Sequence, residues 1–332
     1  MVKTRYLIII YICIMLGVFI LPNVLITKFD MGQTYIDEGK RIYTKDTVNL
    51  YLSKQDKSIN LNLEEYIMSV VAAEMPASYE IEALKAQAVI ARTYTLNKIE
   101  TKKIYGNENH PDSDICDDIN DCQAYITKED RIDKWNKSNE DANVLWKKIE
   151  EAVISTQGII ITYKDEPIKA FFHANSGGMT EDVELVWNGE PIEYLKSVET
   201  VGENNYTQYS SSVEYSCDEF KNIMKKRYAN FDINFSDQNC IKIIDRSKSN
   251  RILNIQIGNI EMTGVNVREI FGLKSTNFEV LIKDSKVIFN VIGYGHGIGM
   301  SQTGANELAK SGYNYEDIIH HFYTNVKIEN IN

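Results

Sequence analysis

Residues 62–79 read NLEEYIMSVVAAEMPASY, and this stretch decides the fold of the chain. Asn62 with Glu65 three residues later predicts a capped helix start, and Pro76 predicts that the helix ends just beyond Glu74. The apolar residues between them recur at the spacing of one buried helical face: Leu63, Tyr66, Ile67, Val70 and Val71. Glu74 occupies the next position on that face, so the sequence predicts a carboxylate that points into the protein.

An inward carboxylate at the last turn of a helix is a candidate catalytic acid. Apolar surroundings and the negative end of the helix dipole both disfavour its charged form, so we expect a raised pKa for Glu74. Ser78 predicts a second helix from Tyr79 to about residue 99, with Lys85 and Arg92 seven residues apart on one face. In one interpretation these two cations frame the acid; in the other they form a solvated face that includes a salt bridge to it.

The composition is that of an acidic globular protein. The 332 residues are 43% hydrophobic and 25% charged, with a formal net charge of −11. Phosphate binding requires clusters of basic residues, and the chain carries short basic pairs such as Lys147-Lys148. We therefore expect no nucleic-acid partner, whereas binding of an uncharged glycan is compatible with this charge.

The amino terminus predicts a membrane anchor. No charged residue interrupts residues 6–27, and this run is apolar and long enough to cross a bilayer as a helix. Lys3 and Arg5 precede it and no small-residue cleavage site follows, which favours a retained single-pass anchor over a removed signal peptide. Residues 1–5 then lie in the cytoplasm, 28–47 form a juxtamembrane linker, and 48–332 form a catalytic domain outside the cytoplasmic membrane.

A loop rich in Asp and Asn carries His110, Cys116 and Cys122, with five residues between each and the next. Thiolates and an imidazole are typical zinc ligands, although this spacing is not that of a zinc knuckle. A Cys116–Cys122 disulfide and free thiols are the alternatives, because the even number of cysteines in the exported part permits disulfides. Whether Cys217 pairs with Cys240 stays open.

The remaining patterns predict an α+β fold: a helical catalytic core packed with antiparallel β-hairpins and a smaller mixed subdomain. Residues 159–163 and 168–174 predict the two strands of a hairpin that delivers His173 to the loop Ser176-Gly177-Gly178. This loop lacks the Gly-x-Ser-x-Gly elbow, which disfavours a serine nucleophile. Short polar and apolar alternations predict a subdomain or long excursion at about 201–287.

Residues 293–300 read GYGHGIGM, with a glycine at every second position. Such a backbone can approach a ligand or another segment very closely, and Tyr294 and His296 lie between the glycines. Neither a Gly-Lys-Ser/Thr ending nor a dinucleotide spacing follows, so we do not expect nucleotide binding. Two further helices are predicted at 302–310 and 315–322.

Three segments carry motifs of unusual specificity. They are VVAAEMPASY with EALKAQA and ARTY at 70–94, FHANSGG at 172–178, and GHGIGMSQ at 295–302. Together they resemble the stage II sporulation protein D family. The resemblance extends over about 48–328, which is nearly the whole exported part.

The resemblance implies a membrane-anchored lytic transglycosylase that cuts the glycan strands of peptidoglycan during engulfment of the forespore. It implies peptide-free strands as the substrate, and the stage II sporulation proteins P and M as partners. Glu74 matches the catalytic glutamate of the family, and Lys85 and Arg92 match cleft residues important for activity. His173 and His296 match parts of the family pattern to which no role is assigned.

The resemblance also bears on the cysteine loop and on substrate contacts. Related clostridial proteins carry a metal site built from one His and two Cys in the equivalent loop, which favours His110, Cys116 and Cys122 as ligands of a structural zinc ion. The further candidates for substrate contact are Tyr94, Ser176, Tyr294 and Trp187. The three aromatic residues could stack on sugar rings, and packing in the core is the alternative role for each of them.

Two other functional classes stay open. A lytic transglycosylase uses the C6 hydroxyl of the sugar as nucleophile, so Glu74 alone can serve as acid and then base, whereas a muramidase needs a second carboxylate. The candidates for that carboxylate lie beside the Ser-Gly-Gly loop: Glu181, Asp182 and Glu184. The second alternative is a non-catalytic glycan-binding enhancer of a peptidoglycan amidase, because part of the wider family is described as enhancing amidases.

Overall fold

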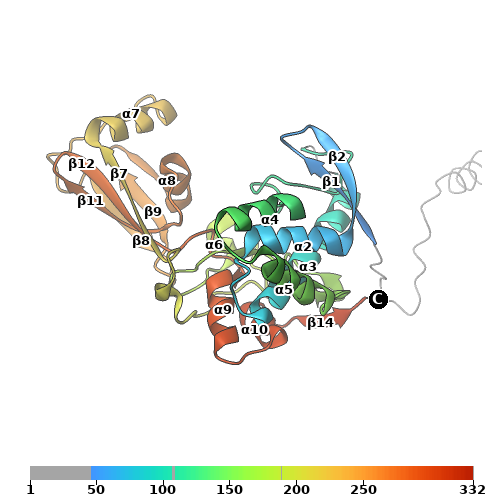
Figure 1. Cartoon of the computed structure of the whole chain (residues 1–332). Helices are drawn as coiled ribbons and strands as arrows, with labels where there is room; N and C mark the ends of the chain where they lie inside the picture. The colour runs from blue at the N-terminus through green and yellow to red at the C-terminus, as the bar shows by residue number, and fades with distance from the viewer. Residues whose placement is uncertain (1–45, 107–108, 188, 332) are drawn as a thin grey trace, which may run out of the picture. The chain divides into compact units, whose positions relative to one another are not determined.

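The computed structural model describes residues 46–106, 109–187 and 189–331 (Figure 1). The predicted anchor at 6–27 and the segments around it, 1–5 and 28–45, lie outside the described residues. Within the described part of the chain, no helix has both the length and the apolar character needed to cross a membrane. The predicted mixed α+β class is confirmed, because helices alternate with several small, mostly antiparallel sheets.

The helices gather around one large hydrophobic core. α3 (Ile81–Tyr105) is its central element, and helices from both ends of the chain pack on it. Alanines at 83, 86, 88 and 91 are fully buried on α3 and allow its neighbours to approach closely. The other helices of this part are α2 (Leu63–Glu74), α4 (Lys128–Lys137), α5 (Ala142–Ile154), α6 (Val183–Trp187), α9 (Gln302–Lys310) and α10 (Tyr315–Phe322).

The first two helices test the sequence predictions most directly. α2 has the predicted bounds, and the Asn62 side chain accepts hydrogen bonds from the N–H groups of Glu64 and Glu65. The prediction for the second helix was wrong at both ends. Ser78 does not cap α3, because the helix begins at residue 81 and the N–H of Glu80 donates to Asn306 Oδ1 at 2.7 Å instead.

At its other end α3 continues past residue 99, because neither glycine nor proline interrupts the sequence before Gly106. Gly106 has φ of +74° and ends the helix. The two carboxyl-terminal helices, by contrast, have the predicted bounds, since α9 spans Gln302–Lys310 and α10 spans Tyr315–Phe322. The strong start signals explain this agreement, because Ser301 and Asn314 both cap their helices with side-chain hydrogen bonds.

Short sheets place the loops around this core. β1 (Thr47–Leu52) pairs antiparallel with β2 (Lys57–Asn62) and parallel with β3 (Ile115–Cys116), which fixes the start of the cysteine loop. β4 (Ile159–Tyr163) lies between β5 (Glu166–Pro167) and β14 (Lys327–Asn330).

The prediction that residues 168–174 form the second strand of this hairpin was wrong. Pairing with β4 stops at Pro167, and the chain leaves that sheet. β6 (Phe172–His173) instead pairs in parallel with β13 (Met300–Ser301). The FHANSGG and GHGIGMSQ segments are therefore neighbours in space, a long-range pairing that local sequence pattern cannot reveal.

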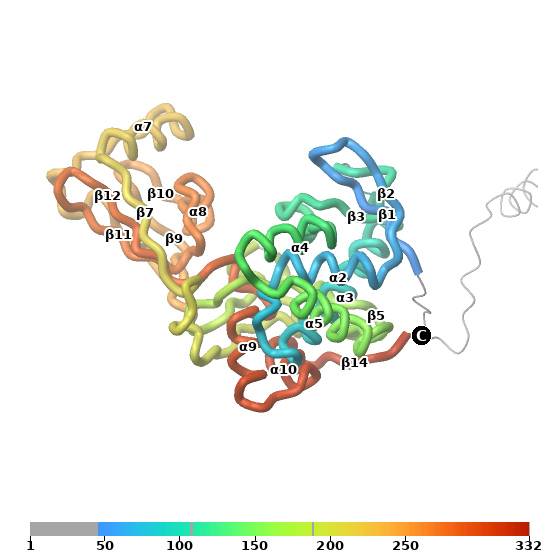
Figure 2. The backbone as a smooth tube through the Cα atoms, in the orientation of Figure 1, coloured from blue at the N-terminus to red at the C-terminus, as the bar shows by residue number. Residues whose placement is uncertain are grey.

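Residues 210–292 build a second hydrophobic core of their own, centred on Phe220, Phe271, Phe278 and Phe289. Figure 2 traces the backbone of this part of the chain. Two three-stranded antiparallel sheets, ordered β11-β12-β7 and β10-β9-β8, carry it. Its elements are β7 (Ser210–Ser216), α7 (Cys217–Arg227), β8 (Ile241–Arg246), β9 (Ile252–Ile257), β10 (Ile260–Thr263), α8 (Gly264–Phe271), β11 (Asn277–Lys283) and β12 (Lys286–Ile292). A short 3₁₀ turn, η1 (Glu203–Asn205), precedes this part of the chain.

Candidate functional site

A cavity of about 780 Å³ lies beside the carboxyl-terminal end of α2 and contains Glu74 in its wall. Several segments that are distant in sequence line it. They are the end of α2 with Tyr79, the face of α3 around Tyr94 and Lys98, residues 119–123, Arg131 of α4, Lys169 with residues 171–174, Trp187, Gln208, residues 294–296 and Gln302. All three motif segments therefore meet at this cavity, because FHANSGG and GHGIGMSQ line it together with the segment that carries Glu74.

Glu74 lies partly buried at the last turn of α2, as its position on the apolar face predicted. Its Oε1 accepts a hydrogen bond from the N–H of Ala124 at 2.7 Å. Burial raises the pKa of Glu74, and the Ala124 hydrogen bond acts in the opposite direction without reversing the shift. A carboxyl group with a raised pKa next to an open cavity is better suited to act as a general acid than an ordinary exposed glutamate.

Two histidines of the cavity lining lie together, with ring centroids 5.6 Å apart; His173 is buried and His296 is partly buried. The Nδ1–H of His173 donates to the carbonyl of Ile298 at 3.2 Å, while His296 Nδ1 accepts from the N–H of the same Ile298 at 3.0 Å. Burial, and then the charge of Arg251, lowers the pKa of His173 to about 3. Burial and the neighbouring His173 lower the pKa of His296 well below its usual value, so both rings are neutral at pH 7.

The Nε2 atom of His173 is buried and has no hydrogen-bond partner among the described residues. Because Nδ1 carries the proton, this Nε2 is an acceptor in the cavity wall. Two aromatic side chains of the cavity lining are exposed. Trp187 is 45% exposed, with its ring centroid 5.1 Å from that of His296, and Tyr294 is 43% exposed under the ammonium group of Lys274. Exposed rings beside a polar acceptor are a typical way to bind sugars.

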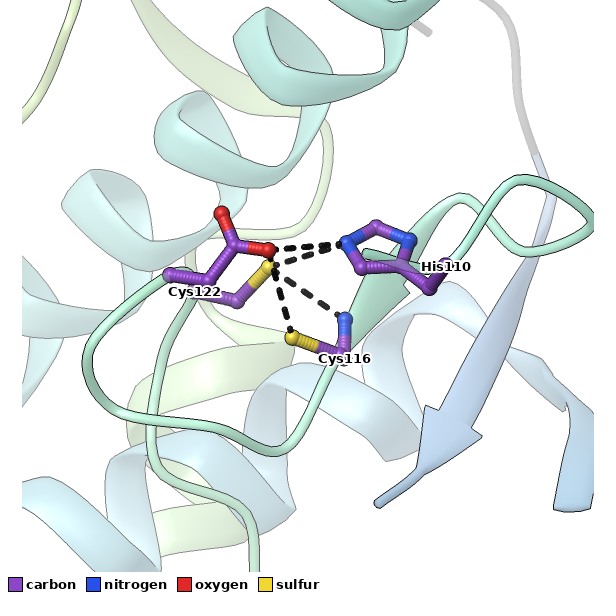
Figure 3. A group of neighbouring side chains, drawn as sticks. His110, Cys116 and Cys122 are labelled. Atoms are coloured by element: carbon purple, nitrogen blue, oxygen red, sulfur yellow. Dashed lines mark hydrogen bonds and ion pairs between the residues drawn. The ribbon is translucent and has the colours of Figure 1, made fainter. Parts of the chain in front are cut away.

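A cluster of potential metal ligands lies beside the cavity (Figure 3), and two of its members, Asp121 and Cys122, line it. His110, Cys116, Asp121 and Cys122 each offer a ligand atom, and these four atoms lie within 4.8 Å of one another. His110 Nδ1–H donates to the carbonyl of Ser113 at 3.0 Å, so its Nε2 faces Cys122 Sγ at 3.6 Å and Asp121 Oδ2 at 3.4 Å. Metal-binding histidines commonly have such a second hydrogen bond.

One nitrogen, two sulfurs and one carboxylate oxygen suit four-coordinate Zn²⁺, so the residues fit that ion. The sequence analysis named three members of this cluster as candidate zinc ligands. It missed Asp121, whose position directly before Cys122 was the available signal. The four described cysteines are free thiols, and the alternative of a Cys116–Cys122 disulfide is not formed.

Three residues expected at the site lie elsewhere, so these interpretations are corrected. Lys85 forms an ion pair with Glu82 of its own helix at 2.7 Å. Arg92 is wholly buried and paired with Glu64, because its position on α3 faces the helical core. Ser176 is buried and its hydroxyl donates to the carboxylate of Glu203. None of the three lines the cavity.

A buried polar network holds the histidine loops in place. Glu203 accepts hydrogen bonds from the hydroxyls of Ser176, Thr200 and Ser301. Burial alone would raise the pKa of Glu203, but these hydrogen bonds lower it overall, so the carboxylate is ionised. No local pattern predicts this network, because its members come from three distant segments of the chain.

Arg251, from the second core region, is fully buried against the glycine-rich segment and donates to the carbonyls of Ser176 at 3.0 Å and Gly295 at 3.4 Å. Burial lowers its pKa to about 10, so the guanidinium is still charged at pH 7. A Cβ at Gly297, where φ is +86°, would lie 2.6 Å from the guanidinium. The glycines predicted to permit close backbone approach do so here, against Arg251.

Residues 51–163 match the family model described as Stage II sporulation protein. The chain is 32% identical over 283 residues to Stage II sporulation protein D of Bacillus subtilis (strain 168), an alignment that covers 85% of this chain and 78% of that relative. The chain belongs to the stage II sporulation protein D family. Its family relative from Bacillus amyloliquefaciens is 34% identical over the same shares of both chains.

A more distant relative widens this assignment. The protein named Amidase enhancer of Bacillus subtilis (strain 168) is 26% identical over 307 residues, which covers 77% of this chain and 39% of the relative. The family resemblance drawn from the three motifs is therefore confirmed, and the sporulation protein D family is related to a protein named for its effect on an amidase.

Proposed function

We propose that this family member is a lytic transglycosylase that cleaves the bond between N-acetylmuramic acid and N-acetylglucosamine in peptidoglycan glycan strands. We further propose that it acts during forespore engulfment, anchored by residues 6–27 with its catalytic part outside the cytoplasmic membrane, together with sporulation proteins P and M. The membership of the family and the placement of Glu74 in a cavity wall support this proposal.

Glu74 carries the chemistry in this proposal. In its neutral form it protonates the bridging oxygen as the bond from that oxygen to C1 of the muramic acid breaks. The resulting Glu74 carboxylate then takes the proton of the C6 hydroxyl of the same sugar, whose oxygen attacks C1 and closes a 1,6-anhydro ring. Burial that raises the pKa of Glu74 favours the first step, and the Ala124 hydrogen bond stabilises the carboxylate needed for the second.

The scarcity of carboxylates around the cavity supports this reaction over hydrolysis. Among the described lining residues the carboxylates are Glu74 and Asp121, and Asp121 is engaged by Lys98 at 3.0 Å. The residues considered for a hydrolase do not line the cavity: Glu181 accepts from Ser247 and Ser249, Asp182 accepts from the N–H of Ser197, and Glu184 pairs with Lys196. One residue that acts first as acid and then as base is sufficient if the substrate supplies its own nucleophile.

Substrate contacts follow from the other walls. We propose that the buried ring of His173 positions His296, which lies against it, and that His296 in turn supports the ring of Trp187 from behind. Trp187 and Tyr294 are proposed to stack on sugar rings. Tyr94 is buried and donates its hydroxyl to the carbonyl of Asp121 at 3.1 Å, so its proposed part is to shape the wall.

We propose that His110, Cys116, Asp121 and Cys122 hold a zinc ion. Bound zinc supplies a structural cross-link for the loop that carries Ala124, the hydrogen-bond donor to Glu74. The residues themselves already order this loop in part, since the N–H of Cys116 donates to Cys122 Sγ at 3.3 Å.

The experiment that tests the assignment compares two glutamate-to-glutamine substitutions in the same helix, α2. Glu74→Gln keeps the shape of the side chain but cannot cycle a proton, so cleavage of purified glycan strands should fall by at least about 10²-fold. Glu65→Gln changes an exposed glutamate of the same helix and should leave cleavage unchanged. Retained cleavage in a folded Glu74→Gln protein would overturn the proposal.

The similarity to the protein named Amidase enhancer supports one alternative, a non-catalytic glycan-binding partner of an amidase. This alternative predicts that the purified full chain leaves glycan strands intact and increases the turnover of an added peptidoglycan amidase. The same cleavage assay with wild-type protein separates the two, because a lytic transglycosylase cuts strands without any partner.

A further inference from the structure

The charge lining the cavity differs from that of the whole chain. The chain is acidic, with a net charge of −11, but the cations Lys98, Arg131 and Lys169 line the cavity together with the two carboxylates already described. Lys98 is paired with Asp121. Among the described residues, Arg131 and Lys169 have no carboxylate within ion-pair distance, so positive charge in the cavity is left uncompensated.

Arg131 is the more confined of these two cations. Its guanidinium lies over the ring of the buried Trp135, with Cζ 4.7 Å from the ring centroid, and its Nε is buried without a hydrogen-bond partner in the described structure. Burial lowers the pKa of Arg131, and the charge of Glu140 opposes this shift from beyond ion-pair distance. A charged donor that is partly desolvated and unpaired costs free energy unless a ligand satisfies it.

The position of Arg131 connects it to the reacting group. Residues 119–123 line the cavity, Ala124 donates to Glu74, and α4 with Arg131 begins four residues later. One continuous segment therefore contacts the proposed proton donor and presents the guanidinium to the same cavity. A planar guanidinium stacked on an aromatic ring is fixed in orientation and binds carboxylates through two parallel hydrogen bonds.

We propose that Arg131 forms an anion subsite that binds the lactyl carboxylate of a muramic acid residue whose stem peptide has been removed. This inference rests on the proposed glycan substrate and adds a specificity-determining residue to it. A muramic acid that carries a peptide has an amide at this position, which has no charge for the guanidinium to bind. Exposed Lys169 adds attraction over a longer range, weakened by salt.

The test measures binding with a full-length Glu74→Gln protein, so that no strand is cut during the titration. The probes are peptide-free glycan strands, the same strands with the lactyl carboxylate reduced to an alcohol, and strands that retain their stem peptides. Calorimetry should show that the carboxylate strands bind about 10- to 100-fold more tightly than the reduced strands, the range of a charge-assisted hydrogen bond.

Adding Arg131→Gln should bring this ratio close to one, whereas Lys134→Gln, which removes an exposed cation from the same helix, should leave it unchanged. Arg131→Lys retains the charge without the bidentate geometry and should keep part of the preference, which also separates a binding effect from misfolding. Thermal unfolding of each variant provides the folding control.

The subsite would be overturned if Arg131→Gln left the affinity ratio of carboxylate strands to reduced strands unchanged. It would also be overturned if that ratio were already one in the Glu74→Gln protein. Tighter binding of peptide-bearing strands would also overturn it, because the anion would then belong to the stem peptide. Neither result bears on Glu74, whose role is decided by cleavage with the wild-type protein. Conversely, a protein that binds carboxylate strands selectively but never cuts them would keep the subsite and lose the proposed reaction.

Discussion

Replacement of Arg92 should destabilise the protein and should not alter its chemistry. The family resemblance marks Arg92 as a residue important for activity, but its side chain is fully buried and points away from the cavity lining. Its Nε and one terminal nitrogen donate to the two oxygens of Glu64 at 2.9 and 2.5 Å. It also donates to the carbonyls of Ile159 at 3.1 Å and Val153 at 3.4 Å, which links α3 to α2, α5 and β4.

The magnitude follows from what each substitution leaves behind. Arg92→Met leaves the Glu64 carboxylate, whose side chain is 11% exposed, without its partner, and breaking a buried pair in this way costs about 3–5 kcal/mol. That loss is a large fraction of the roughly 5–15 kcal/mol that holds a typical domain folded. Replacing both partners, as in Arg92→Met with Glu64→Leu, removes the unpaired charge and should leave a loss of about 1–2 kcal/mol for the two carbonyls.

Urea unfolding of the single and double variants measures this difference. The control is Lys85→Met, which removes a partly exposed ion pair within one helix and should change the free energy of unfolding by no more than about 0.5 kcal/mol. The double variant should cut glycan strands at the wild-type rate per folded molecule. If Arg92→Met unfolds like the wild type yet loses glycan binding, the reasoning is refuted and Arg92 contacts substrate.

Three further predictions concern the metal cluster, the proton donor and the glycine segment. A chelator should lower the thermal unfolding midpoint of the wild type, and added zinc should restore it. The midpoint of His110→Ala should be low from the start and should change with neither chelator nor zinc. Equal midpoints in all samples would contradict a zinc site. Because burial raises the folded-state pKa of Glu74, the ionised carboxylate opposes folding above that pKa, and the penalty disappears as the pH falls below the unfolded-state value. Glu74→Gln should therefore unfold at a higher temperature than the wild type at pH 8, and this difference should disappear near pH 4. A difference that does not depend on pH would contradict the raised pKa of Glu74. Gly297→Ala should lower stability by about 1 kcal/mol or more and should slow cleavage, measured by unfolding and strand assays, because its Cβ would meet Arg251 and its φ is positive.

The sequence was most informative where structure is set locally. Apolar spacing and the Asn62 cap predicted α2 with its bounds, and the same spacing placed Glu74 on the inward face. The alternating glycines predicted close backbone approach, and Gly297 lies directly against a guanidinium. The helix and the glycine conformation depend on residues close in sequence, so a single segment predicts them, whereas the partner of Gly297 does not follow from that segment.

Long-range partners could not be predicted in the same way. Arg92 and Lys85 share a helical face by spacing, but only the packing of α2 shows that Arg92 meets Glu64 in the core. Asp121 joins the ligand cluster because β3 and the following loop fold back toward His110, and no spacing rule describes that return. Arg131 gave no signal either, since its significance depends on the absence of a nearby carboxylate in a cavity built from distant segments.

The central claim is that Glu74 acts alone and that the sugar supplies the nucleophile. Mass spectrometry of strands cut by the wild-type protein tests it most directly, because an anhydro end is one water lighter than a reducing end. The account predicts 1,6-anhydromuramic acid at every new end, in amounts that disappear with Glu74→Gln. New reducing ends would show that water is the nucleophile, and would contradict it.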